Sequence, residues 1–251
     1  KAYKDIIANG HDKGSFLELN NYSYILNHEG LNKNIVSAVD VNYDYLCNEM
    51  FWYMTASEDL ASLNKIKSTG NNRSSETEFS NSAYGHIIFK RHGYNQLEQV
   101  IECLSKDKNS RRAVINFNVP DRHRIDIKDE ICTYALQFYI NDDKLNCTCM
   151  MRSNDSYGCL PYDLAFFTEL QKYVAFSLGI SCGTYTHFAV SFHLYKRDLE
   201  KVAKIKPHRD IEFNLVNLVS QLPNLIPIAK YDYFYKDIVN IFKKFGVLCL
   251  N

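Results

Sequence analysis

The sequence predicts a single α+β domain over residues 1–251, with one large mixed β-sheet flanked by helices. Two observations lead to this prediction. Segments in which apolar residues recur every three or four positions are interspersed with shorter segments that are β-branched or alternate between apolar and polar residues. No linker, repeat or low-complexity block divides the chain, and an apolar content of 46% is ample for one packed core.

Two helices are expected in the first half of the chain. The first covers residues 41–56, where no Gly or Pro interrupts a spacing of three and four residues between its inward positions. These positions are Tyr45, Leu46, Glu49, Met50 and Tyr53. The second helix is amphipathic and ends near Lys106, with apolar positions at Leu97, Val100, Ile101 and Leu104. Between the two, the polar residues 68–82 predict a loop.

Three strands are expected after the second helix. Residues 113–119 are rich in β-branched residues and stop at Pro120, which has no N–H for a ladder. Residues 131–140 and 144–151 predict a hairpin, because the Asn-Asp-Asp run between them is a short turn of the kind that joins antiparallel strands.

The rest of the chain predicts a long helix followed by further strands. The helix spans residues 160–179, with Pro161 at its opening and Gly179 near its C-terminal end, where each residue type is favoured. Residues 183–193 predict a strand. The remaining expected elements are a helix at 196–205 and two aromatic-rich strands at 211–216 and 230–235.

Charge and hydropathy narrow the classes of partner. The 29 basic and 29 acidic residues cancel, so the net charge gives no reason to expect a nucleic-acid or membrane partner. No stretch approaches the roughly 18 consecutive apolar residues of a membrane-spanning helix. The first residues carry no hydrophobic secretion signal. We therefore expect a soluble cytoplasmic protein.

The eight cysteines are expected to stay reduced, since the chain is long and shows no export signal. Cys147 and Cys149 are one residue apart, which is the wrong spacing for a zinc knuckle, and no second Cys/His pair stands nearby. Alternation along the 144–151 strand places these two cysteines on one buried face. No metal site is predicted.

The most informative stretch is Arg-Ser-Asn-Asp-Ser-Tyr-Gly-Cys-Leu-Pro-Tyr-Asp, residues 152–163, which begins twenty residues after Cys132. It resembles the nucleotide-binding segment of the thymidylate synthase family, in which the Arg-Ser pair holds a phosphate and the last residue reads a pyrimidine ring. The resemblance runs from about residue 44 to about residue 199 and is strongest over 110–163. It implies a thymidylate synthase-like fold and a homodimeric enzyme.

By this resemblance, Cys132 is the nucleophile. Its Cys-Thr pair opens a strand, as does the Pro-Cys-His segment of the family, and Cys-Thr is typical of the hydroxymethylase branch. A thiolate that adds to C6 of a pyrimidine converts C5 into a nucleophile, which is covalent catalysis. A cationic neighbour favours the thiolate, and Arg152 is the candidate. The alternative is a buried cysteine with no chemical role.

Arg111, Arg112, Arg152 and Ser153 are the expected phosphate ligands. The resemblance assigns the Arg111–Arg112 pair to a homodimer, in which it reaches the phosphate held by the partner, and a planar guanidinium suits a phosphomonoester. On their own, two arginines before a strand are usually solvated surface. The further phosphate arginine of the family has no match near Gly14, so the fourth ligand stays open.

Other site residues also come from the resemblance. Glu49, in a helix with Phe51-Trp52-Tyr53, would move protons between the ring, the folate nitrogen and water. Tyr84 matches a Tyr-Gly pair near the nucleophile, and His193 and Tyr195 match residues that bond a sugar hydroxyl.

The resemblance implies a reduced folate, 5,10-methylenetetrahydrofolate, as co-substrate. Asp155 is the expected partner of its pterin ring, and Trp52 is assigned to the same cofactor site. In thymidylate synthases a Trp pair shields the exocyclic methylene intermediate from water. The polar residues 71–75 stand in the corresponding region here, so water could add to that intermediate.

Asp163 decides the expected base. Thymidylate synthases carry Asn there, which matches the N3–H donor and O4 acceptor of uracil, whereas Asp is the pattern of the cytidylate hydroxymethylases. Cytosine reverses the order, with N3 an acceptor and N4 a donor. A carboxyl group can match this order of donor and acceptor in two ways. It can donate its proton to N3, or it can face an N3-protonated ring as a carboxylate.

We therefore expect a CMP or dCMP 5-hydroxymethyltransferase. The alternatives are a thymidylate synthase or dUMP hydroxymethylase that tolerates Asp163, and a catalytically silent relative that binds nucleotide or RNA. The sequence leaves open whether the sugar is ribose or deoxyribose, and whether the product serves phage DNA modification or a nucleoside natural product.

Overall fold

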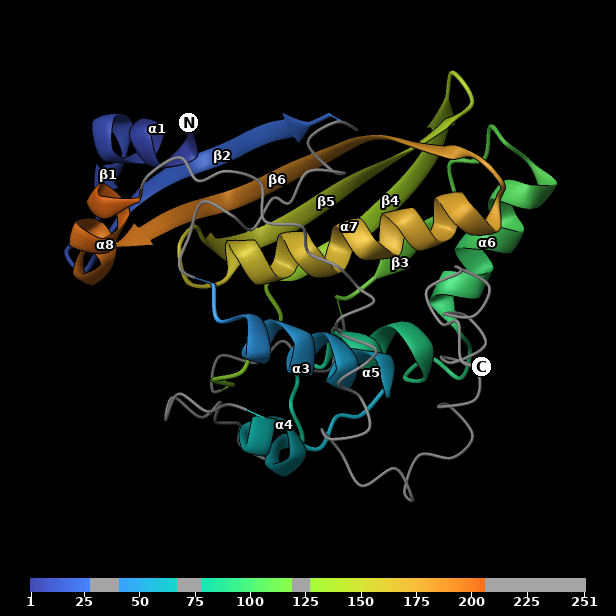
Figure 1. The fold of residues 1–251 in the computed structure, drawn as a ribbon, viewed down its shortest axis with the longest axis horizontal. Coiled ribbons are helices and arrows are strands. Elements are labelled where there is room, and N and C mark those ends of the chain that lie inside the picture. Colours follow the sequence, from blue (N-terminus) through green and yellow to red (C-terminus); the bar gives the residue numbers. More distant parts are fainter. Residues whose placement is uncertain (28–40, 67–77, 119–126, 206–251) are drawn as a thin grey trace, which may run out of the picture.

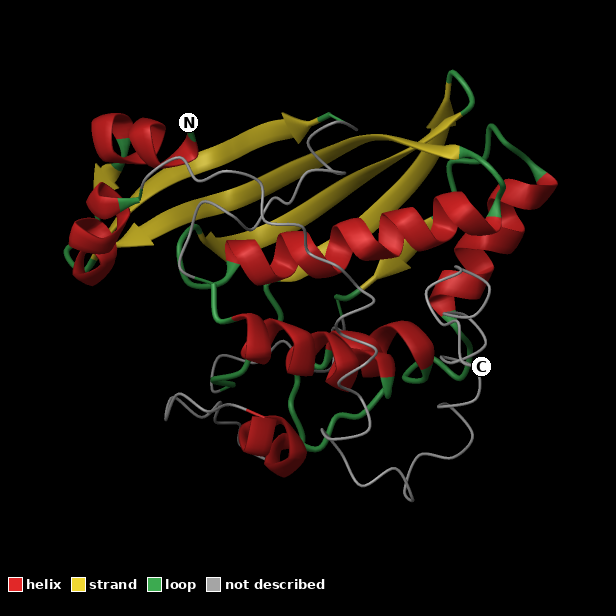
Figure 2. Ribbon diagram, in the orientation of Figure 1, coloured by secondary structure: helices red, strands yellow, loops and turns green. Residues whose placement is uncertain are grey.

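The computed structural model describes residues 1–27, 41–66, 78–118 and 127–205. Within these ranges the backbone forms a six-stranded sheet in the order β1-β2-β6-β5-β4-β3, with helices mainly on one side of it (Figures 1 and 2). The mixed sheet and flanking helices agree with the α+β prediction.

The strands are β1 (His11–Asp12), β2 (Phe16–Leu26), β3 (Val114–Asn116), β4 (Thr133–Asn141), β5 (Lys144–Asp155) and β6 (Ser181–Tyr195). The α-helices are α1 (Ala2–Asn9), α3 (Tyr43–Met54), α4 (Leu60–Ile66), α5 (Tyr84–Phe89), α6 (Gln96–Lys106), α7 (Leu160–Ser177) and α8 (Leu199–Lys204). A 3-10 turn, η2 (Lys196–Asp198), precedes α8.

The sheet is mixed because β5 and β6 run parallel while the other neighbouring strands are antiparallel. A parallel pair needs a crossover connection, and α7 supplies it between β5 and β6. The antiparallel pair β4–β5 instead closes in a tight turn, in which Asn141 lies opposite Lys144. Asp142 and Asp143 both have positive φ, 51° and 52°, as a two-residue type I′ turn requires.

Three layers build the core. Figure 1 shows α7 along one face of the sheet, with α3 and α5 on the far side of α7. Strand residues Phe138, Cys147, Cys149 and Tyr185 face inward and are fully buried, and Phe167 of α7 packs in the same core. Cys147 and Cys149 therefore share the buried face that the alternation predicted.

Several predicted boundaries hold to within a few residues. The first helix is shorter than 41–56 at both ends, and the last begins as a 3-10 turn. The strand expected over 113–119 ends at Asn116, because the amides of Phe117 and Asn118 share one carbonyl acceptor, that of Tyr134. This sharing breaks the ladder one residue after Asn116.

Other predicted features differ or lie outside the described residues. No prediction covered α1, β1, β2, α4 or α5, although Leu17, Leu19, Tyr22 and Tyr24 of β2 pack against the core. The strands expected at 211–216 and 230–235, most of the loop at 68–82 and the polar residues at 71–75 fall outside the described ranges.

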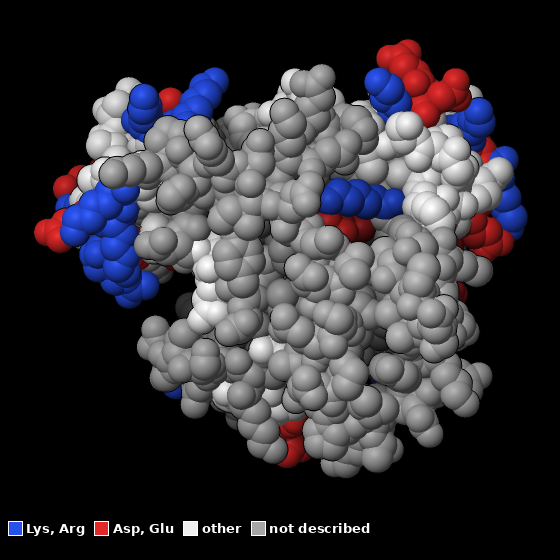
Figure 3. Space-filling model, in the orientation of Figure 1, with Lys and Arg blue, Asp and Glu red and all other residues white. Residues whose placement is uncertain are grey.

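Charged side chains pair at the two ends of the molecule. At the β1–α8 end Lys196 contacts Asp12 and Lys201 contacts Asp198, each at 2.7 Å. Figure 3 shows Lys and Arg beside Asp and Glu at both ends of the visible face. Across the parts of the chain that the structure describes, no helix combines the length and apolarity needed to cross a membrane.

Candidate active site

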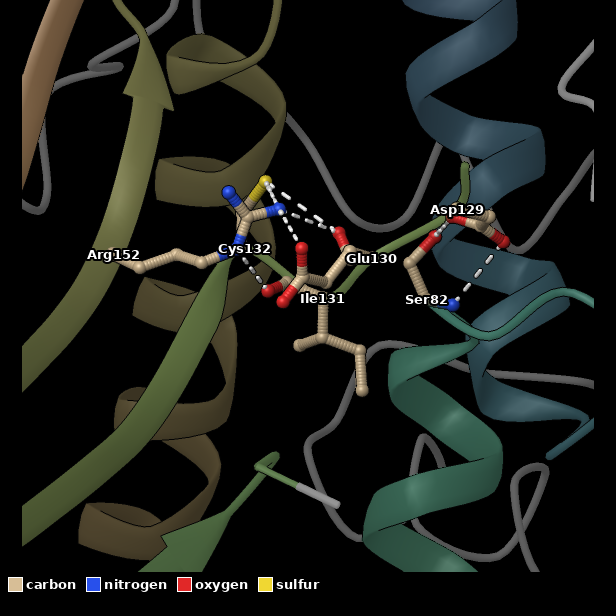
Figure 4. A network of polar contacts seen from close by, with 6 residues as sticks. All are labelled: Ser82, Asp129, Glu130, Ile131, Cys132 and Arg152. Atoms are coloured by element: carbon tan, nitrogen blue, oxygen red, sulfur yellow. Dashed lines mark hydrogen bonds and ion pairs between the residues drawn. The ribbon is translucent and has the colours of Figure 1, made fainter. Parts of the chain in front are cut away.

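Cys132 lies just before β4, and Arg152 reaches it from the neighbouring strand β5 (Figure 4). The Arg152 backbone N–H donates to the Cys132 carbonyl at 2.9 Å. In the guanidinium, Nε donates to the Ile131 carbonyl at 2.8 Å and Nη2 to the Glu130 carbonyl at 3.0 Å. Nη2 is also 3.7 Å from Cys132 Sγ. Nη2 also pairs with the Glu130 carboxylate at 3.8 Å. These contacts hold the guanidinium beside the sulfur.

Asp129 ties this segment to the start of α5 (Figure 4). Its Oδ2 accepts from Ser80 Oγ at 2.9 Å and from the Asn81 amide at 2.8 Å. Ser82 donates twice, from Oγ to Oδ1 at 2.6 Å and from its amide to Oδ2 at 3.3 Å. The carboxylate thereby joins the loop that carries Cys132 to the helix that carries Tyr84.

We expect Asp129→Asn to lower the free energy of unfolding by about 1–3 kcal/mol and to reduce turnover. In the Asp129→Asn variant only the amide oxygen can accept a hydrogen bond. The NH2 group would therefore face either the donors that now bond Oδ1 or those that now bond Oδ2, and these hydrogen bonds would be lost. Urea unfolding and a turnover assay measure the two effects. Asp142→Asn is the matched control, since Asp142 is exposed at a positive φ that Asn tolerates. Equal stability of the two variants would contradict the proposed tie.

Tyr84 is held by close packing of two helices. A Cβ on Gly85 would lie 1.7 Å from the Tyr53 carbonyl oxygen, so only glycine lets α5 approach α3 this closely. The Tyr84 ring stacks on Tyr53 at 5.5 Å, and its hydroxyl lies 2.9 Å from Thr133 Oγ1. Burial raises the pKa of Tyr84 well above its usual value, and the nearby charges of Asp163 and Cys132 raise it further. Tyr84 is therefore a neutral hydroxyl near both side chains.

Asp163 lies in the first turn of α7 and is half-buried. Its Oδ2 accepts a hydrogen bond from Asn154 Nδ2 at 2.9 Å. Asn154 belongs to β5, two residues after Arg152, and is 2% exposed. The end of β5 and the start of α7 thus bring the expected phosphate ligand and the expected base reader to the same region.

Glu49 faces inward from α3 and is 4% exposed. The Tyr45 hydroxyl donates to Glu49 Oε1, and the Tyr45 ring packs edge-on against Tyr162 of α7, with ring centroids 5.1 Å apart. Burial raises the pKa of Tyr162, and the charge of Glu49 adds to this. Glu49 is thus next to the first turn of α7, which carries Asp163.

His193 and Tyr195 lie on one face at the end of β6, with ring centroids 5.2 Å apart. Burial lowers the pKa of His193, so the ring is neutral near pH 7 and can both donate and accept a hydrogen bond. The charges of Asp155 and Glu18 raise this pKa and the charge of Arg152 lowers it, but burial has the largest effect. Ser153 is in register with Ser191 of β6, two residues before His193.

Arg111 and Arg112 lie before the edge strand β3 and are exposed. The Arg111 carbonyl accepts from Gln137 Nε2 at 3.3 Å, and the Arg112 amide donates to Ser110 Oγ at 3.3 Å. Within the described part of the chain, neither guanidinium forms an ion pair. The structure therefore does not bring this pair to Cys132 through contacts within one chain.

The two expected folate residues differ in their surroundings. Asp155 Oδ1 accepts from the amides of Tyr157 and Gly158 at 3.0 Å, and the carboxylate can accept an N–H of a pterin. Trp52 is 1% exposed, and its indole N–H donates to Ser62 Oγ at 3.0 Å. The expected contact of Trp52 with a folate does not fit this burial, which makes Trp52 part of the core. The described residues hold no cluster of metal-ligating side chains.

A family profile described as thymidylate synthase matches residues 3–238, which is most of the chain. The chain belongs to the thymidylate synthase family. The solved structure of thermostable thymidylate synthase A from Bacillus subtilis aligns with a TM-score of 0.68 and 22% identity, over 84% of this chain and 83% of that one. The described chain therefore has the thymidylate synthase fold.

Curated relatives in the thymidylate synthase family match in part. A protein of Methanococcoides burtonii, named provisionally as a thymidylate synthase, is 40% identical over 113 residues. That match covers 44% of this chain and 51% of the relative, so the chain spans about half of that protein. The thymidylate synthase of Francisella philomiragia is 23% identical over 218 residues, which cover 81% of this chain and 78% of that protein.

Sequence reasoning gave no role to three residues of this thymidylate synthase site. Asp129 carries the loop of the expected nucleophile, Thr133 bonds Tyr84, and Asn154 bonds Asp163. Asp129 is three residues before Cys132 and Asn154 lies inside the motif at residues 152–163, and this closeness was the available signal. The partners of Asp129 are 47–49 residues away in sequence, and the partner of Asn154 is 9 residues away on another element. Short-range sequence patterns do not indicate such pairs.

Proposed function

We propose that this chain is a pyrimidine-nucleotide C5 hydroxymethyltransferase that acts on CMP or dCMP with 5,10-methylenetetrahydrofolate as co-substrate. In this proposal residues 1–251 form one catalytic domain. The observation that carries it is the carboxyl group of Asp163, which bonds Asn154 two residues after Arg152 and raises the pKa of Tyr84. A base reader with uracil preference would be an amide at this position.

The described residues suit each step of this reaction. Cys132 Sγ adds to C6 of the ring, and C5 then forms a bond to the one-carbon unit that the folate supplies. Loss of the C5 proton and of tetrahydrofolate leaves an exocyclic methylene group. Water adds to it, the thiolate leaves C6, and the product carries CH2OH at C5. Glu49 and its Tyr45 partner are the groups proposed to move protons through water.

Binding of the nucleotide is assigned to one end of the parallel strand pair, where both strands finish. Arg152 and Ser153 at the end of β5 would bind the phosphate, and a neutral His193 with Tyr195 would bond a sugar hydroxyl. Asp155 would bond the pterin N–H. These assignments make the C-terminal ends of β5 and β6 the nucleotide site.

Thymidylate synthesis is the second candidate function. It is favoured by the name of the Francisella philomiragia relative, whose sequence matches over most of this chain. In that reaction the methylene group would be reduced by hydride from the folate rather than hydrated. With dUMP as substrate, the Asp163 carboxyl group would accept the N–H of N3. It could donate a hydrogen bond to O4 only if it were itself protonated.

Product analysis separates the two candidates. The protein is incubated with the folate and with CMP, dCMP or dUMP, and each nucleotide is analysed by mass spectrometry. We expect CH2O to be added to a cytidine nucleotide. Addition of CH2 to dUMP would identify a thymidylate synthase instead, and no turnover of any nucleotide would support a silent relative.

A homodimer is part of the proposal. Ile25 of β2 and Val190 of β6 are 63% and 42% exposed on neighbouring strands, which suits a surface that contacts another copy. The exposed Arg111 and Arg112 would then be available to the phosphate in the partner's site.

We expect Arg111→Ala and Cys132→Ala subunits, each inactive alone, to recover activity when mixed into hybrid dimers. One of the two sites in each hybrid then has an intact Cys132 together with Arg111 from its partner. Turnover by purified hybrids measures the recovery. Lys106→Ala, an exposed residue on α6, should leave turnover unchanged. Inactive hybrids would show that Arg111 serves its own subunit.

A further inference from the structure

Asn154 is a buried polar side chain that the mechanism above does not use. It lies near the end of β5, between Ser153 and Asp155, and is in register with Phe192 of β6. Its Nδ2 donates to Asp163 Oδ2 at 2.9 Å. Because an Asn amide is uncharged at every working pH, this donor is present whatever the protonation state of Asp163.

This hydrogen bond constrains the carboxyl group. With an N–H donated to Oδ2, that oxygen is an acceptor, so any proton on Asp163 belongs on Oδ1. A cytosine ring needs one acceptor for its 4-amino group and one group that matches N3. The bond from Asn154 therefore fixes which carboxyl oxygen takes which role.

The second amide atom of Asn154 points to a further contact. Among the residues that the structure describes, its buried Oδ1 has no hydrogen-bond partner, although buried polar atoms are rarely left unpaired. Both amide atoms belong to one small planar group, so this acceptor lies next to the carboxyl group of Asp163. The 4-amino group of cytosine has two hydrogens, so once Asp163 Oδ2 accepts one of them, the second needs another acceptor.

Three titratable groups among the described residues feel the charge of Asp163, namely Tyr84, Tyr24 and Cys149. Burial raises the pKa values of Tyr84, Tyr24 and Cys149, so all three are protonated near neutral pH, and the charge of Asp163 raises each further. The amide oxygen of Asn154 is thus distinguished from them as a strong acceptor that cannot donate. The O4 atom of uracil has no hydrogen to give it.

We propose that Asn154 is a second specificity-determining residue for the base. Its Nδ2–H orients Asp163, and its Oδ1 accepts the second hydrogen of the cytosine 4-amino group, directly or through one ordered water. This inference rests on the proposed function, since it takes a cytosine nucleotide as the substrate.

The test compares kcat/KM for dCMP and dUMP in wild type, Asn154→Leu and Asn154→Ala. Leucine is close in volume to asparagine but removes both polar atoms. We expect the cytosine-to-uracil ratio to fall by about tenfold or more in both variants, mainly through loss of activity on dCMP. Affinity for ribose 5-phosphate, a probe without a base, should change little, because the phosphate and sugar ligands are untouched.

Asn146→Ala is the matched control. Asn146 is also a buried Asn of β5, but its amide bonds the Lys144 carbonyl and Thr184 instead of Asp163. This variant should lose stability and keep the wild-type base ratio. If Asn154→Leu does not fold, as judged by circular dichroism, Asn154→Ala decides the question by the same ratio.

The outcomes separate this inference from the proposed function. A wild type that prefers dUMP overturns the proposed function, and the role of Asn154 with it. A wild type that prefers dCMP, together with a ratio in the folded variants within about twofold of wild type, overturns the role of Asn154 alone.

Discussion

Cys132→Ala is expected to reduce turnover by more than about a thousandfold, or ~4 kcal/mol in activation free energy, while nucleotide affinity stays nearly unchanged. The thiolate supplies the covalent bond to C6, which exists only after binding, so it contributes little to ground-state affinity. Turnover and calorimetric titration with dCMP measure the two quantities separately.

Cys182→Ala is the control for this experiment. Cys182 is a free, buried cysteine at the start of β6, at the opposite end of that strand from His193 and Tyr195. Its loss should leave a small cavity and unchanged turnover. Residual activity of Cys132→Ala within about tenfold of wild type, a loss of only ~1.4 kcal/mol, would remove this thiol from the mechanism.

The elements that the sequence predicted well carry their signals within a few residues. Pro161 and Gly179 mark the two ends of α7, and Gly179 adopts φ +67° as a residue that ends a helix often does. The Asp142–Asp143 turn marks the hairpin. Asn95 caps α6 through hydrogen bonds to two amides of its first turn. Such signals need no knowledge of distant parts of the chain.

The features that were not predicted depend on contacts with distant parts of the chain, or have an interrupted alternation of apolar and polar residues. In β2 two exposed asparagines interrupt the series of residues that face the core, and Asn21 has φ 55°. This interruption weakens the alternating pattern by which a strand is predicted. The early end of β3 follows from the Tyr134 carbonyl on another strand. The sequence around β3 carries no local signal of this acceptor.

The site residues divide in the same way. Cys132 and Arg152 were predicted as neighbours because a known motif spaces them, and the structure brings them within 3.7 Å. Trp52 was assigned to a folate from its position in that motif, yet its burial depends on how α3 packs against neighbouring helices. The partnership of Asn154 with Asp163 crosses from β5 to α7, and only the folded chain reveals it.

Asp163→Asn is expected to lose activity on cytidylate and gain activity on uridylate. The carboxamide presents an N–H donor for O4 and an acceptor for N3–H, which is the opposite order to that required by cytosine. One mismatched hydrogen-bond pair should shift the preference by roughly 10- to 100-fold, about 1.4–2.8 kcal/mol.

The product of Asp163→Asn should still carry CH2OH, because the substitution changes the base reader and leaves the access of water alone. Asp155→Asn is the matched control, since Asp155 lies on the same segment but bonds the Tyr157 and Gly158 amides. Its base preference should stay that of wild type, with the larger effect on KM for the folate. An unchanged preference for cytosine in Asp163→Asn would show that another group reads the base, and Asn154 would then be the first residue to substitute alone.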